Sequence, residues 1–97
     1  MEHPCCKKTV RTEEERTRLI HRLNRIEGQI RGIRKMLEND AYCTDILTQS
    51  AAVNAAVSAF NKELLASHIR GCVVRDVQAG QNDAVEELVA ALQKLMR

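Results

Sequence analysis

Two cysteines and a histidine stand at the ends of one uninterrupted stretch of the sequence. Cys43 opens the stretch, and His68 and Cys72 close it, four residues apart and on one face of a helix. The stretch has no Pro and no Gly before Gly71, which predicts one long helix. Cys43 precedes His68 by 25 residues. At about 1.5 Å per residue this is roughly 37 Å, so one straight helix keeps the ligands apart.

Two chains can bring together what one helix separates. If the helix packs antiparallel against its copy and crosses it near residues 56 and 57, Cys43 of one chain lies opposite His68 and Cys72 of the other. The alanine-rich run 51–59 lies at this crossing, and small side chains let helices approach closely. Two-fold symmetry then predicts two identical sites in each dimer.

Each such site offers two thiolates and one imidazole, soft ligands that favour Cu(I), Zn(II) and related ions. Three ligands suit trigonal Cu(I), whereas a structural zinc site takes four. Tyr42 and Glu87 are candidates to hydrogen-bond to the ligands and so to select the metal-binding nitrogen of the histidine. Two alternatives stay open. In the first, Cys43 and Cys72 are core cysteines and His68 is a surface residue. In the second, the two thiols form a disulfide or persulfide bridge between chains.

Composition favours a single helical domain in a reducing compartment. The chain has 97 residues and only two aromatic side chains, so a core of aliphatic residues is expected. The N-terminal residues contain no apolar h-region, so they are not a secretory signal, and no apolar run approaches the roughly 20 residues of a membrane span. The expectation is a cytoplasmic protein without a membrane partner. Cysteines there are usually reduced. No Ser/His/Asp order or carboxylate pair suggests an enzyme.

Three helices are predicted, which makes the fold all-α. Residues 1–11 are expected to form a flexible arm, in which the roles of His3, Cys5 and Cys6 stay open, and residues 12–97 the domain. The first helix begins after Thr12 and ends near residues 38–40. Its apolar residues recur at spacings of four and three, as in a coiled-coil seam: Leu19, Leu23, Ile26, Ile30, Ile33 and Leu37.

The second helix is expected from about residue 41 to about residue 78, continuous or kinked at Gly71. Its predicted buried face comprises Ile46, Leu47, Val53, Val57, Phe60, Leu64 and Leu65. A turn at Gly80 precedes the third helix, from Asp83 to about Met96, whose packed face comprises Ala84, Val85, Leu88, Leu92 and Leu95. The long helices of two chains then form an antiparallel four-helix bundle.

Positive charge gathers in the first third of the chain. Residues 1–35 carry ten Lys or Arg against five Glu, whereas residues 36–97 carry five against eight acidic residues. Such an asymmetry suits binding to a polyanion, and Arg offers paired donors to phosphate. We expect the first helix to contact DNA through its cations: Arg16, Arg18, Arg22, Arg25, Arg31, Arg34 and Lys35.

Three motifs resemble those of the copper-sensitive operon repressor (CsoR) family. Residues 22–33 read RLNRIEGQIRGI, residues 40–49 read DAYCTDILTQ, and residues 68–72 read HIRGC. The corresponding family patterns are R-L-x-R-I-E-G-Q-[VI]-R-G, D-x-Y-C-x-D-I-L-x-Q and H-x-x-x-C. All three occur in order and at the expected separation, so the resemblance is specific and covers residues 12–97.

The resemblance implies an all-α transcriptional repressor whose homodimers pair into a homotetramer. The metal-free form would bind double-stranded operator DNA upstream of copper-efflux genes. Cu(I), one ion per protomer at the dimer interface, would release the DNA. The implied ligands are Cys43 of one chain with His68 and Cys72 of the other, and Tyr42 would support them. Glu87 matches the family's supporting glutamate only if the preceding turn lacks one residue.

Other branches of the family sense other effectors. The nickel/cobalt and formaldehyde branches lack the second cysteine, and the persulfide branch lacks the histidine, so Cys72 and His68 favour the copper branch. The cysteines of the N-terminal arm depart from the family pattern. A sensor of another soft metal ion and a thiol-sensing repressor therefore stay as alternatives, as does an interaction module without a ligand.

Overall fold

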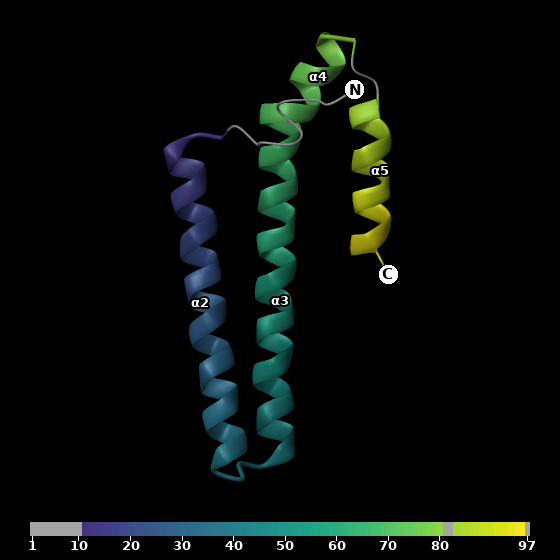
Figure 1. The fold of residues 1–97 in the computed structure, drawn as a ribbon. Coiled ribbons are helices and arrows are strands. Elements are labelled where there is room, and N and C mark those ends of the chain that lie inside the picture. Colours follow the sequence, from purple (N-terminus) through teal and green to yellow (C-terminus); the bar gives the residue numbers. More distant parts are fainter. Residues whose placement is uncertain (1–10, 81–82, 97) are drawn as a thin grey trace. The chain divides into compact units, whose positions relative to one another are not determined.

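The computed structural model describes residues 11–80 and 83–96, without the side chains of Cys72, Val73, Asp76 and Ala84. All regular structure in these ranges is helical, which confirms the all-α class: α2 (Glu13–Glu38), α3 (Cys43–His68), η1 (Ile69–Val73), α4 (Val74–Gln78) and α5 (Asp83–Leu95) (Figure 1). None of the described helices combines the length and apolarity needed to cross a membrane. The arm predicted over residues 1–11 lies outside the described residues except for Arg11.

Helix α2 ends where the sequence predicted, in a Schellman motif. The backbone N–H of Ala41 donates to the carbonyl of Met36 at 2.9 Å, and the N–H of Asp40 donates to that of Leu37 at 3.2 Å. Asp40 takes the left-handed conformation that this motif requires, with φ 53°. The chain reverses within residues 39–42, so α2 and α3 form an antiparallel hairpin (Figure 1).

The second predicted helix is continuous but changes its winding near the end. It runs as α3 to His68, becomes a π-helix at Ile69–Val73, and continues as α4 to Gln78. The N–H of Val74 donates to the carbonyl of Ile69, five residues earlier, as π-winding requires. Gly71 lies within the π-helix, so the glycine that was expected either to be tolerated or to mark a kink marks a change in winding.

The core of the hairpin follows one half of the predicted seam. Leu19 and Ile26 are buried, with 6% and 7% of their surface exposed, and Ile33 is half-buried in the same row. From α3, Ile46, Val53, Phe60 and Leu64 are half-buried. Residues seven apart return to nearly the same side of a helix, so Leu19, Ile26 and Ile33 form the row that faces α3.

The other half of the seam is exposed in the single chain. Leu23, Ile30 and Leu37 on α2 are 43%, 48% and 66% exposed, and on α3 Leu47 and Val57 are 63% and 37% exposed. One neighbouring helix covers only one side of α2, so a seam with two rows needs a second neighbour to be buried. We call these five residues the apolar face.

The chain from Leu65 onward belongs to a second compact unit, whereas Glu13–Leu64 form the first. In the second unit, α4 contacts η1, and α5 contacts both of them. Leu88 and Leu92 of α5 are half-buried, but Val85 and Leu95 are 41% and 47% exposed, so the predicted packed face of the third helix is only partly covered. The single domain expected over residues 12–97 stays a prediction.

Replacing Ile26 with Ala should lower the free energy of unfolding by about 2–5 kcal/mol, because the truncation leaves a cavity in the row that faces α3. Ile20→Ala is the matched control on the same helix, since Ile20 is 46% exposed, and it should cost about 0.5 kcal/mol or less. Urea unfolding followed by circular dichroism, at one protein concentration, measures both. Equal losses in the two variants would contradict the assigned core.

Candidate metal centre and nucleic-acid interface

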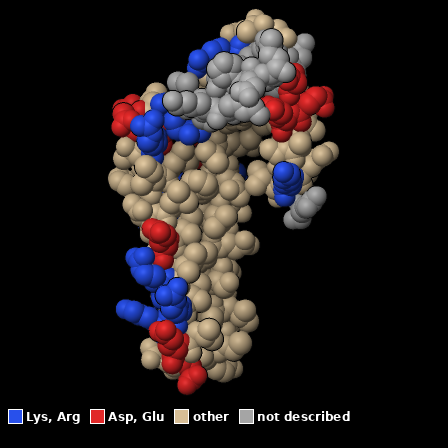
Figure 2. Space-filling view, viewed as in Figure 1, with Lys and Arg blue, Asp and Glu red and all other residues tan. Residues whose placement is uncertain are grey.

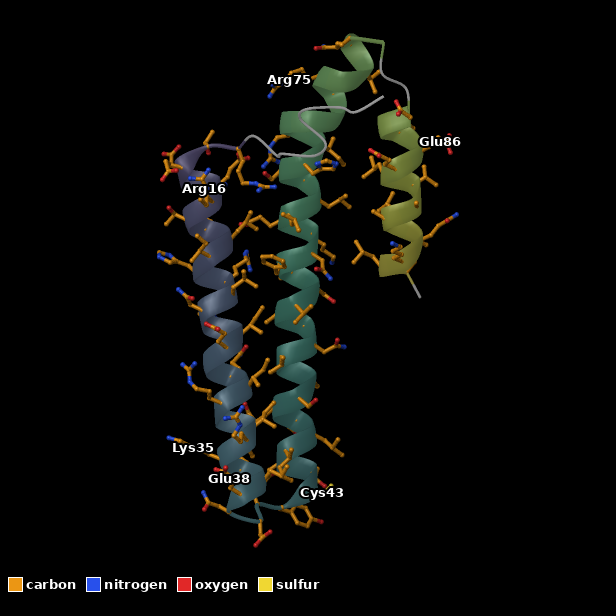
Figure 3. All side chains as sticks on the ribbon, viewed as in Figure 1. Arg16, Lys35, Glu38, Cys43, Arg75 and Glu86 are labelled. Atoms are coloured by element: carbon orange, nitrogen blue, oxygen red, sulfur yellow. The ribbon has the colours of Figure 1, made fainter. Side chains whose placement is uncertain are left out.

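The first candidate ligand lies at the start of α3. Cys43 is the first residue of the helix, and its thiol is free and exposed (Figure 3). Tyr42 precedes it and is 73% exposed. The carbonyl of Tyr42 accepts from the N–H groups of Asp45 and Ile46 at 3.0 and 3.2 Å. The first turn of α3 therefore fixes the backbone beside the thiol and leaves both side chains open to a partner.

The second candidate ligand lies at the other end of the same helix. His68 is the last residue of α3 and is half-buried. Cys72 follows within η1, but its side chain lies outside the described residues. Because the helix is unbroken from Cys43 to His68, their separation of roughly 37 Å along its axis holds as the sequence predicted. One chain does not join these two groups.

The two ligands nevertheless share one side of α3. The 25 residues between Cys43 and His68 make almost seven turns at about 3.6 residues per turn, so both side chains start from nearly the same direction. Val57 falls between them in the same column, almost four turns after Cys43 and about three turns before His68. The apolar face thus runs between the two candidate ligands.

Glu87, a predicted supporting residue, is exposed on α5. Helix α5 contacts η1, the segment that carries Cys72. Among the side chains that the structure describes, no group of three or more His, Cys, Asp or Glu residues could hold a metal ion. The predicted ligand set and the roles of Tyr42 and Glu87 stay predictions.

Charged side chains of the hairpin lie along its α2 edge, beside a broad uncharged surface (Figure 2). The predicted DNA-binding cations divide into two groups within the described residues. Arg16 pairs with Glu13 on the same helix. Arg18 and Arg22 both pair with Glu63 of α3, at 3.8 and 3.4 Å. Four cations have exposed side chains and no ion pair in the described part of the chain: Arg25, Arg31, Arg34 and Lys35.

Sequence reasoning missed the polar side of the hairpin. Arg22, Arg25 and Gln29 of α2 and Ala56 of α3 line a cavity of about 120 Å³. Glu63 lies two turns beyond Ala56 on α3. One signal could have identified Glu63, because it is the only acidic residue between Asp45 and Asp76. A lone acid on a helix that packs against an arginine-rich helix indicates an interhelical ion pair.

The hairpin therefore has two different sides. Gln29 follows Ile26 by three residues and Leu23 precedes it by three, so they lie about 60° to either side of the buried row. The cavity and Glu63 lie on the Gln29 side, and the apolar face lies on the Leu23 side. A partner that covers the apolar face leaves the polar side accessible.

The chain is similar to known metal-responsive regulators. The family model described as metal-sensitive transcriptional repressor matches residues 15–94. The chain is 40% identical over 88 residues to the copper-sensing transcriptional repressor CsoR of Bacillus subtilis (strain 168), covering 90% of this chain and 87% of that protein. It is also 40% identical over 87 residues to the copper-sensing transcriptional repressor RicR of Mycobacterium tuberculosis (strain ATCC 25618 / H37Rv), covering 87% and 91%.

Two solved structures share the fold. The copper-sensing repressor CsoR with Cu(I) from Geobacillus thermodenitrificans NG80-2 has a TM-score of 0.86 and 37% sequence identity, and the match covers 91% of this chain and 93% of that one. The nickel-responsive transcriptional regulator InrS has a TM-score of 0.70 and 34% identity, over 80% and 89% of the two chains. By its motifs, its sequence and its fold, the chain belongs to the metal-sensitive transcriptional repressor family, which is the family of CsoR.

Proposed function

We propose that this protein is a Cu(I)-responsive transcriptional repressor. Its metal-free form binds double-stranded operator DNA of copper-efflux genes. One Cu(I) per protomer binds Cys43 of one protomer with His68 and Cys72 of the partner subunit, and the protein then releases the DNA. The carrying observation is that Cys43 and His68 lie at opposite ends of one 26-residue helix and on the same side of it.

The apolar face supports the dimer that this site requires. Val57 lies at the middle of the proposed crossing, and Leu47 lies one turn after Cys43. Burying the five exposed residues of the face against a second copy would complete the seam that α2 leaves half-covered. The antiparallel pairing that buries the face also brings Cys43 of each protomer to His68 of the other. Packing and metal binding thus require the same arrangement.

The donor set supports Cu(I) as the effector. Two thiolates and one imidazole are soft ligands, and three of them suit a trigonal ion. The exposed thiol of Cys43 is accessible to a metal ion and to a partner chain. Copper is also the metal named for both relatives that are 40% identical. The nickel-responsive relative keeps another metal ion as the second candidate, because its structure shares this fold.

The cations of α2 supply the proposed contacts to operator phosphates. Arg25, Arg31, Arg34 and Lys35 are exposed and point to several sides of the helix, since they are not spaced on a single face. DNA can therefore contact only some of them at once, and dimers that pair into a tetramer would present several copies of each. Release requires that Cu(I) bind the DNA-free state more tightly than the DNA-bound state.

Co-expression of two differently tagged chains tests the shared site. One chain carries Cys43→Ala and the other His68→Ala, so each homodimer has two broken sites. The mixed dimer keeps one intact site, because the chain with Cys43→Ala supplies His68 and Cys72 to the other chain's Cys43. We expect high-affinity Cu(I) binding, measured against a competing chelator, only in the mixed dimer and at half the wild-type stoichiometry. A site within one chain predicts no recovery.

Fluorescence anisotropy tests the effector on a DNA fragment selected by the protein from its own genome. One Cu(I) per protomer should lower DNA affinity about 5- to 150-fold, the usual range of allosteric coupling. His68→Ala should abolish this response, because it removes one ligand. Polysulfide should leave the DNA affinity of the wild type high. Release by polysulfide that persists in His68→Ala would instead establish the thiol-sensing alternative, and release by Ni(II) the second metal.

Sedimentation velocity tests the dimer contact. Val57→Glu places a charge at the centre of the apolar face and should convert dimers and larger species to monomers, because an unpaired carboxylate cannot be buried there without large cost. Ala52→Glu is the control, since Ala52 is exposed on the same helix but lies on the side away from Val57. Association that survives Val57→Glu would show that another surface joins the chains.

A further inference from the structure

The cavity on the polar side of the hairpin has the chemistry of an anion site. Two of its four lining residues are arginines, Arg22 and Arg25, and no acidic residue lines it. Its volume is about 120 Å³. Two guanidinium groups beside a small polar cavity match the oxygen pairs of a phosphate group better than a single point charge does.

Arg22 forms an ion pair with Glu63 of α3. Its Nε donates to Oε1 of Glu63 at 3.4 Å, and it makes no other hydrogen bond or ion pair within the described residues. In the described part of the chain, the terminal nitrogens of its guanidinium group therefore have no partner. Glu63 also faces Nε of Arg18 at 3.8 Å, a distance too long for a hydrogen bond. Glu63 thus orients the guanidinium without occupying the donors that a second anion would use.

Gln29 supplies a neutral polar side chain to the lining of the cavity. Its Oε1 is buried and has no hydrogen-bond partner among the described residues. Because this oxygen is buried, the group that Gln29 can offer to an anion is the NH₂ at the other end of the amide, which donates hydrogen bonds.

We propose that the cavity formed by Arg22, Arg25, Gln29 and Ala56 binds one phosphate group, that of the operator backbone, and that Glu63 is the positioning residue that orients Arg22 for it. The proposal deepens the proposed function and rests on it only for the source of the phosphate. Arg25 and the terminal nitrogens of Arg22 donate to the phosphate oxygens. Because the cavity lies away from the apolar face, dimerisation through that face leaves it open to DNA.

Titration of the metal-free, full-length protein with inorganic phosphate tests the site without DNA. The side-chain Nε–H signals of Arg22 and Arg25 in the ¹⁵N spectrum should shift and saturate, while that of Arg31, on a different side of α2, should not. Gln29→Glu should abolish the shifts by placing a like charge in the cavity, and Glu63→Ala should weaken binding. Shifts of Arg22 and Arg25 no larger than that of Arg31 would overturn the site.

A second titration, with a short DNA duplex of mixed sequence and no metal, tests the source of the phosphate. Gln29→Glu should lower affinity and reduce the slope of log K against log salt by about one, as expected for one lost phosphate contact. Binding of inorganic phosphate with an unchanged DNA slope would mean that the cavity takes free phosphate and would overturn the assignment to DNA.

A matched variant distinguishes the positioning role of Glu63 from the effect of its negative charge. Glu38 is exposed on the same hairpin and has no ion pair in the described residues. Glu63→Ala and Glu38→Ala each remove one negative charge, so a purely electrostatic role predicts equally tighter DNA binding in both. Positioning predicts weaker binding in Glu63→Ala alone, with thermal unfolding measured to confirm that both variants fold. None of these measurements involves copper, so their results do not depend on whether Cu(I) is the effector.

Discussion

The rigidity of a single helix is the constraint on which the rest of this protein depends. Helix α3 runs without a break from Cys43 to His68, and its hydrogen-bonded backbone holds the two side chains roughly 37 Å apart. No rotamer change can close such a distance. The two ends can join in one site only when a second helix runs in the opposite direction. Helix length therefore makes the proposed sensor a property of two chains, and it ties metal binding to subunit packing.

The same packing divides the surface of the hairpin between two tasks. A row of aliphatic side chains at seven-residue spacing turns α2 toward α3, and the rows on either side of it have opposite character. One side exposes Leu23, Ile30 and Leu37. The other carries Arg22, Arg25 and the cavity. In the proposed assembly the apolar side meets the partner and the polar side meets DNA, so both partners bind the same pair of helices without competing for surface.

Glu63 connects the two helices electrostatically. It lies on α3, five residues before His68, and it contacts two arginines of α2. Both N···O distances are long, so Glu63 orients the two arginines without using all of their N–H donors. The π-helix at Ile69–Val73 follows directly after His68 and carries Cys72. Such single-turn irregularities are frequent at functional sites.

The sequence by itself determined the helical class, the ends of α2 and α5 to within about a residue, and the family, because these depend on local spacing, capping and motif order. The separation of Cys43 and His68 also followed from residue counting, since a helix has a fixed rise. The sequence did not show which half of the seam faces α3, because both rows have the same residue types. Only the position of α3 distinguishes them. The pairing of Glu63 with Arg18 and Arg22, and the cavity beside Gln29, join residues that local spacing does not connect. Only the tertiary structure decides them, because contacts between helices depend on how the helices are rotated and staggered when they pack.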